Sequence, residues 1–282
     1  MPEPTLRSLV VPDGLDPGAL VLLVTLAVGY VVGVRRLAAR GRRWPRSRGV
    51  VFGAGLAVLA VATQSGLAAY ESVLFSAHSA QHVLLGMAAP ALLALGAPVT
   101  LALQASGRPL HVVLLKVLHS RPARLLAHPV VVWLLFGGTL VALYAGPLLE
   151  QSLRSDLVHT AVHLHVVAAG ALFCWVAIGV DHTPHRLPSG ARVAFVFLAV
   201  PVHAVVGLLL VSTSSLLGGG WYDERPPPWL GDVLADQRTG AGILWAAGEV
   251  FGLLLTGIAL AQWMRADERA GGRADARLHA PG

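Results

Sequence analysis

Seven long apolar segments constrain the fold of this chain more than any other feature of its sequence. Each is long enough to cross a hydrocarbon core about 30 Å thick, which takes roughly 20 helical residues. Charged residues make up only 13% of the chain, against about 25% in an ordinary soluble domain. We therefore predict an all-α, polytopic membrane protein with seven transmembrane helices. They are expected at residues 17–34, 50–70, 74–103, 129–146, 157–180, 193–217 and 240–264.

The basic residues predict how these helices are oriented. If the segments alternate across the membrane, only four of the 21 Lys and Arg residues fall on the side of the N-terminus. Those four are Arg7, Arg154, Arg225 and Arg238. The positive-inside rule places the basic links in the cytoplasm, so we expect the N-terminus outside and the C-terminus inside. Residues 1–16 then form a short extracytoplasmic tail, 17–264 the transmembrane domain, and 265–282 a disordered cytoplasmic tail.

The net charge of +6 and the pI of 10.4 do not indicate a nucleic-acid partner. The basic residues lie in short links between apolar segments, which is the pattern of membrane topology. The first residues contain no basic stretch ahead of an apolar run, so a cleaved signal peptide is not expected. The single cysteine, Cys174, excludes an intramolecular disulfide and any paired-cysteine metal site.

Two pairs of histidines with identical spacing open two of the apolar segments. His78 and His82 stand near the start of the third segment, and His159 and His163 near the start of the fifth. Residues four apart lie on one face of a helix, about one turn from each other. In the predicted topology both pairs lie in the outer third of the membrane, where ionisable side chains are costly unless they face the bundle interior. The pattern predicts a metal or cofactor site between the two helices.

Two further ionisable residues are expected near the middle of the membrane. His203 lies in the sixth segment, where it either ligates the same metal or makes a hydrogen bond between helices. Glu249 lies about midway along the seventh segment. It is either a counter-charge for the histidines, a proton acceptor, or a hydrogen-bonding group between helices.

Three more residues have alternative interpretations. Met87 follows His78 by two and a half α-helical turns, which points it away from that histidine and favours packing, although its thioether is a possible Cu(I) ligand. Asp236 and Gln237 precede the last apolar segment. They either cap that helix, a role favoured for Asp236, or complete an outer polar site.

Several blocks of sequence resemble the caa3-type CtaG family, bacterial membrane proteins of cytochrome c oxidase assembly. The most specific block is FSAHSAQHVLLGMAAPALLALGAPVTLAL, which contains the first histidine pair. The supporting blocks, in the same order as in the family, are HTAVH, LFCWVAIGVD, VPVHAVVG and DQRTGAGILWAAGE. One departure is Cys174, where a tryptophan is expected; this concerns packing more than chemistry.

The resemblance implies a non-enzymatic assembly factor, or copper chaperone, in the plasma membrane of a bacterium, with cytochrome c oxidase subunits as partners. It also implies that copper is the metal and that five histidines bind it. These are His78, His82, His159, His163 and His203. Of four alternative functions, two remain open. A membrane cytochrome remains possible, because paired histidines can ligate haem, and so does a metal permease. A desaturase-type iron enzyme is disfavoured because the chain has no adjacent histidine pair. A retinal protein is excluded because the only lysine, Lys116, lies in a cytoplasmic link.

Overall fold

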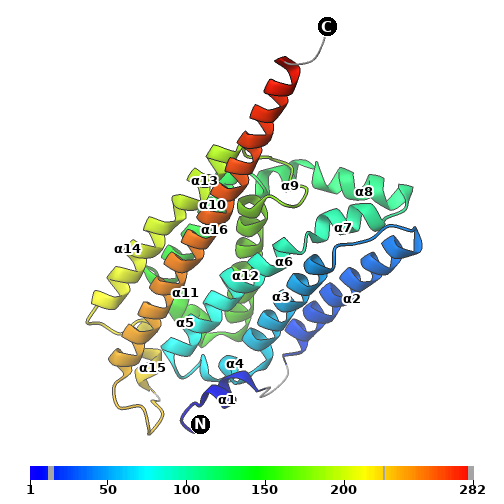
Figure 1. Ribbon diagram of the computed structural model, residues 1–282. Helices are drawn as coiled ribbons and strands as arrows, with labels where there is room; N and C mark the ends of the chain where they lie inside the picture. The colour runs from blue at the N-terminus through cyan, green and yellow to red at the C-terminus, as the bar shows by residue number, and fades with distance from the viewer. Residues whose placement is uncertain (12–15, 225, 279–282) are drawn as a thin grey trace.

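The computed structural model describes residues 1–11, 16–224 and 226–278, with side chains described as far as residue 269. Within these ranges the chain is helical and no strand occurs, so the predicted all-α class is confirmed. The long helices run side by side, and the two termini lie at opposite ends of the bundle (Figure 1). Following the predicted orientation, we call the end with the N-terminus the outer end.

Six helical stretches among the described residues are long and apolar enough to cross a membrane. They are α2 (Pro17–Ala39), α3 (Arg46–Gln64), the broken stretch Phe75–Ala105, α12 (Asp156–Ile178), the stretch Ser189–Ser212, and α16 (Val233–Leu278). A seventh is added if α10 (Pro129–Tyr144) and α11 (Leu148–Arg154), which meet at 74°, form one span. An odd number of crossings places the termini at opposite ends, as observed, so seven spans fit the architecture.

Short helices close the two ends of the bundle (Figure 1). At the outer end these are α1 (Leu6–Val10), α4 (Gly66–Tyr70), η2 (Gly218–Gly220) and α15 (Trp221–Glu224). At the inner end they are α8 (Arg108–Leu118) and α9 (Arg121–Leu126). The stretch Ser189–Ser212 consists of α13 (Ser189–Phe197) and α14 (Ala199–Ser212).

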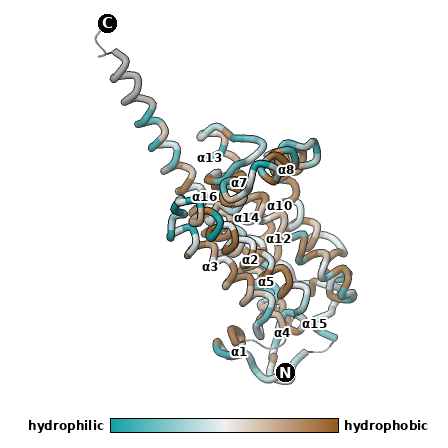
Figure 2. Tube along the Cα trace, turned by 90° about the vertical axis from the view of Figure 1, so that its right-hand side faces the viewer, coloured by the Kyte–Doolittle hydropathy of each residue, from teal (hydrophilic) through white to brown (hydrophobic). Residues whose placement is uncertain are grey.

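The exterior of the bundle is apolar along the long helices, whereas hydrophilic residues gather in the links (Figure 2). On α2, for example, Val21, Val24 and Val28 each expose at least half of their surface. An exposed apolar patch of this extent is not tolerated in water. The surface is therefore that of a protein whose helices contact lipid, in agreement with a multi-pass membrane protein.

The third apolar segment is divided at two places. It begins with α5 (Phe75–Val83), passes through a π-helical turn, η1 (Leu84–Ala88), and continues as α6 (Ala89–Leu95). Pro90 does not end this helix, although it has no backbone N–H to donate. The wider π-helical turn immediately before it accommodates the interruption in the hydrogen-bond pattern. The break comes at Ala97, whose φ of 50° is left-handed, and α7 (Pro98–Ala105) starts afresh. The helix therefore ends at Leu95 and not at Pro90.

The last helix is longer than predicted at both ends. It begins at Val233 because the Asp232 carboxylate accepts hydrogen bonds from the backbone amides of Leu234 and Ala235, at 2.8 and 3.2 Å. It also continues past Met264 to Leu278, where a disordered tail was predicted. The segment is rich in Ala and Arg, which favour helix, and this preference outweighs its high charge. Residues 279–282 lie outside the described residues.

Candidate metal centre

Three segments at the outer end bring a carboxylate and four imidazoles together. Glu71 begins the turn that follows α4. His78 and His82 lie in the first two turns of α5, and His159 and His163 in the first two turns of α12. The Nε2–H of His159 donates a hydrogen bond of 3.0 Å to Glu71 Oε1. His163 Nε2 lies 3.4 Å and His78 Nδ1 4.0 Å from Glu71 Oε2.

The two histidine pairs face each other across this carboxylate. Ring centroids are 4.1 Å apart within each pair. The pairs are joined by His82 and His163, whose centroids are 5.3 Å apart. The third and fifth segments therefore meet as predicted, and all four imidazoles lie in one cluster. We call this cluster, together with Glu71, the outer centre.

The outer centre is buried and incompletely hydrogen-bonded. His78 is fully buried, and His82 and Glu71 expose only 6% and 8% of their surface. Five of its polar atoms have no hydrogen-bond partner among the described residues: Glu71 Oε2, both ring nitrogens of His78, and Nε2 of His82 and of His163. Each such atom costs about 1–3 kcal/mol if it stays unpaired. A concentration of unpaired nitrogens and oxygens in one place is what a metal ion would satisfy.

The spacing of these atoms suits a metal ion. One ligand atom from each of Glu71, His159 and His163 can be chosen so that all lie within 4.8 Å of one another. Four ligands around an ion, with bonds of about 2.0 Å to nitrogen, stand roughly 3.3 Å apart. The observed separations of 3.0 and 3.4 Å are already close to this value. Small side-chain movements would bring His78 or His82 in as a further ligand.

Glu71 is the member of the outer centre that sequence reasoning missed. Burial raises the pKa of its carboxyl, but the hydrogen bond from His159 and the proximity of His163 outweigh burial and lower it to about 2. The carboxylate is therefore ionised at neutral pH. In the sequence Glu71 is distinguished only by its position seven residues before His78. This position lies in an outer link, so Glu71 resembles the other acidic residues of those links.

The outer loop holds Glu71 in place. The Tyr222 hydroxyl of α15 donates to the backbone carbonyl of Glu71 at 3.2 Å, and Trp221 Nε1 donates to that of Ser72 at 2.8 Å. Burial raises the pKa of Tyr222, which keeps this donor protonated. This loop, which precedes α16, contains η2 and α15 and lies over the turn that carries Glu71.

A cleft of about 390 Å³ reaches the outer centre from the side. Glu71, His159 and His163 line it, together with Asp16 at the start of α2 and Thr63 near the end of α3. The cleft lies between helices α2, α3 and α12, and it continues away from the centre along apolar residues of α2 and α12. It gives the centre a route to its surroundings that does not pass through the loop above Glu71.

His203 and Glu249 lie apart from the outer centre. The ring of His203 on α14 faces a small cavity with Met87 and His82 in its lining, and its Nδ1 is bonded to the carbonyl of Ala199 at 3.0 Å. Glu249 follows Gly248, whose backbone packs against the His203 ring. Glu249 Oε1 is buried and has no hydrogen-bond partner in the described part of the chain.

Asp236 and Gln237 have partners other than the histidines. The Asp236 carboxylate accepts hydrogen bonds from the backbone and hydroxyl of Ser76 in the first turn of α5. It therefore holds α5, whereas the cap of α16 is Asp232 and not Asp236 as predicted. Gln237 is buried and bonds the backbone of Ser215 and Leu217. Both residues position elements around the outer centre rather than complete it.

Comparison with known proteins agrees with the resemblance seen in the sequence. An uncharacterized protein of Mycobacterium tuberculosis and one of Mycobacterium bovis are each 38% identical to this chain over 259 residues, and one of Mycobacterium leprae is 35% identical. These matches cover 89% of this chain but 39% of each relative, so the chain spans about two-fifths of their length. No solved structure matches the chain. The sequence profile of the cytochrome c oxidase caa3 assembly factor family (Caa3_CtaG) matches residues 28–266, and the chain belongs to this family.

Proposed function

We propose that this protein binds a copper ion at its outer centre and passes it to a cytochrome c oxidase subunit during assembly of the oxidase. It would act in a bacterial plasma membrane, as a chaperone and not as an enzyme. The observation that supports this most strongly is the buried Glu71 carboxylate among four imidazoles, where five polar atoms lack a partner in the part of the chain that the structure describes. We choose copper rather than another ion because the chain belongs to a family of cytochrome c oxidase assembly factors.

The chemistry of the ligands is compatible with copper. Imidazoles bind Cu and Zn well, and a site of nitrogen and oxygen ligands generally prefers Cu(II) to Zn(II). The carboxylate offsets part of the ion's charge in a site with little water. Because each ligand of the ion would be a separate side chain, from α5, from α12 or from the turn after α4, an incoming ligand could replace them one at a time. Such stepwise exchange is the simplest way to hand a metal to another protein.

The haem alternative is less well supported by the geometry. Two axial histidines have to stand on opposite faces of a porphyrin. Ring centroids 4.1 Å apart within each pair, and 5.3 Å apart between His82 and His163, leave no space for a macrocycle between the two rings of any of these three pairs. The permease alternative would need a polar path from the outer centre to the inner end, whereas the cavity below His82 is lined mostly by apolar side chains.

Metal analysis of detergent-purified protein tests the proposal. We expect about one copper per chain at the outer centre, retained in competition with Zn(II), and no Soret band. His163→Ala and Glu71→Gln should each lose most of this copper. His165→Ala is the matched control, because His165 lies on the same helix and bonds Thr139 on another face. Copper content that is equal in all four proteins, or absent from the wild type, would overturn the proposal.

A further inference from the structure

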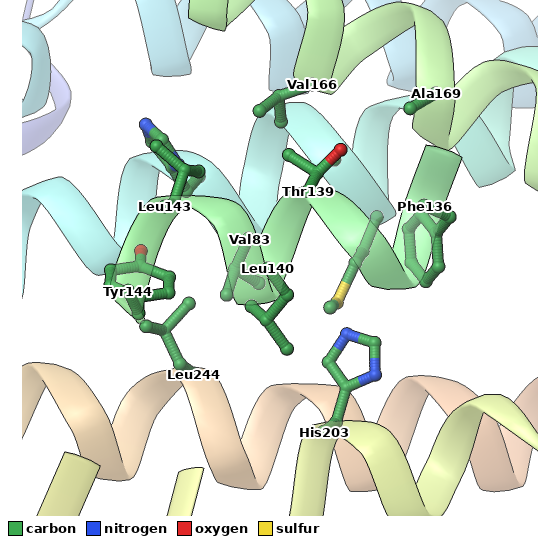
Figure 3. Close-up of a pocket in the computed structure, with 13 residues that line it drawn as sticks. Val83, Phe136, Thr139, Leu140, Leu143, Tyr144, Val166, Ala169, His203 and Leu244 are labelled. Carbon is green, nitrogen blue, oxygen red and sulfur yellow. The ribbon is translucent and has the colours of Figure 1, made fainter. Parts of the chain in front are cut away.

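A cavity of about 50 Å³ lies directly below the outer centre. Three of its lining residues carry atoms that bind soft metals: His82, Met87 and His203. Most of the other lining residues are apolar, among them Val83 and Leu140 (Figure 3). The proposed function does not use this cavity.

The tautomer of His203 is fixed so that one nitrogen is free. A backbone carbonyl can only accept a hydrogen bond, so Nδ1, which is 3.0 Å from the Ala199 carbonyl, carries the proton. The lone pair is then on Nε2, as in metal-binding histidines whose other nitrogen is held by a carbonyl. The ring points into the cavity (Figure 3). A Cβ on Gly248 would lie 2.7 Å from His203 Cδ2, so α16 fits closely against the ring and limits its rotation.

The π-helical turn η1 brings Met87 to the same side as His82. In a regular α-helix, residues five apart point about 140° away from each other. In a π-turn the backbone bond runs from residue i+5 to residue i, as it does here from Ala89 N to Leu84 O. Residues five apart are therefore nearly in register, and both His82 and Met87 line the cavity. The α-helical spacing that predicted Met87 to face away does not apply to this turn.

His82 belongs both to the outer centre and to the lining of the cavity below it. Its ring contacts His78 and His163 in the outer centre, and it also lines the cavity. It is almost fully buried, and its Nε2 has no hydrogen-bond partner within the described residues. An ion that leaves the outer centre inward would meet His82 first.

We propose that this cavity is a second copper position, specific for Cu(I), with Met87 Sδ, His203 Nε2 and His82 as ligands. The inference rests on the proposed function. A thioether and neutral imidazoles form a soft ligand set that favours Cu(I). The apolar lining disfavours a divalent ion, because an uncompensated charge of two is much harder to bury than a charge of one. The ion that moves from the outer centre to this position is Cu(I) at both, so its oxidation state does not change and no electron transfer is involved.

Anaerobic titration with Cu(I) against a chromophoric Cu(I) chelator, followed by X-ray absorption at the copper edge, tests this position. We expect two Cu(I) per wild-type chain, and copper–sulfur scattering at about 2.3 Å. Met87→Leu should lose the sulfur scattering and bind the second ion at least about tenfold more weakly. This substitution conserves volume and is well tolerated in a packed interior. His203→Gln should weaken the second ion to a similar extent.

Met264→Leu is the matched control, because Met264 is exposed near the inner end of α16. It should leave both ions and the sulfur scattering unchanged. One Cu(I) per wild-type chain without sulfur scattering, or scattering that persists in Met87→Leu, would overturn the second position while leaving the outer centre intact. If wild-type protein binds no copper, or if Glu71→Gln leaves the first ion unaffected, it is the proposed function that fails.

Discussion

Glu71 shows how one side chain can change the chemistry of a cluster. Four imidazoles alone would repel one another when protonated, whereas a carboxylate between them gives the protonated state a partner at 3.0 Å. The same carboxylate offers an anionic ligand once the imidazoles lose their protons. Two consequences follow, one for the stability of the metal-free protein and one for metal binding.

The first consequence is a pH-dependent contribution of Glu71 to stability. Its folded-state pKa is lowered from 4.5 to about 2. A carboxyl with a lowered pKa stabilises the fold above its unfolded value and stops doing so as pH falls through the folded value. The wild type should therefore melt at a higher temperature than Glu71→Gln at pH 5.5, and this difference should shrink between pH 4.5 and 2. Thermal unfolding in detergent without metal, followed by circular dichroism, measures it. A difference that stays constant over this range would contradict the ion pair.

The second consequence concerns protons displaced by copper. Imidazole must be neutral to bind a metal, and an ordinary imidazole titrates near pH 6.5. Copper binding at the outer centre should therefore weaken below about pH 6, with protons released on binding. Competition titrations at pH 7.5 and pH 5 check this. Equal affinity at the two pH values would speak against imidazole ligands.

At the level of elements, the contact between η1 and α12 sets the geometry of the outer centre. A Cβ on Gly170 of α12 would lie 2.1 Å from the backbone oxygen of Gly86 in η1. The two helices can approach this closely only because both positions are glycine. Helix α12 carries one histidine pair, and η1 directly follows α5, which carries the other. The separation of η1 and α12 therefore fixes the distance between the two pairs.

Gly170→Ala should therefore damage both stability and metal binding. We expect a loss of about 1–3 kcal/mol, as for other overpacked interiors, and weaker copper binding because the two histidine pairs move apart. Gly138→Ala on α10 is the control, since a Cβ there meets nothing within 4 Å. Melting curves with and without copper compare the two. If both variants behave alike, the close contact does not set the site.

Elements also explain which predictions from sequence succeeded. The helix-period spacing of His78/His82 and of His159/His163 is a local property, so the face that each pair occupies was predictable. That Glu71 faces both pairs was not, because it depends on α15 holding the turn at residues 71 and 72. The position of Met87 was also not predictable, because η1 replaces the α-helical period over one turn. Where the α-helical period is interrupted, the spacing of residues in the sequence no longer predicts the direction in which their side chains point.

For the whole molecule, length and apolarity were enough to predict the helical class and the approximate spans. They could not give the bend between α10 and α11, nor the continuation of α16 to Leu278. The bend depends on a change in chain direction, and the continuation of α16 depends on helix preference outweighing local charge. The length of an apolar segment measures neither. The side of the membrane on which the outer centre lies still rests on the distribution of arginines.

Single-cysteine labelling tests that orientation. Cys174 is buried, and a Cys174→Ala background permits one new cysteine at either end. Asp223→Cys in the outer loop should react with a membrane-impermeant maleimide in intact cells. Arg42→Cys, between α2 and α3, should react only after the cells are opened. The reverse pattern would invert the topology and place the outer centre in the cytoplasm.

The cleft between α2, α3 and α12 has a consequence for the kinetics of transfer. With the α15 loop bonded over Glu71, an ion in the outer centre would be reached from the side, through a space of about 390 Å³. A slender acceptor, such as an extended peptide with a single thiolate or imidazole at its tip, fits such a space, whereas a bulky chelator does not. The rate of copper release should therefore depend on the shape of the acceptor. The affinity of the acceptor determines how much copper it holds at equilibrium, whereas its ability to enter the cleft determines how fast it receives the ion.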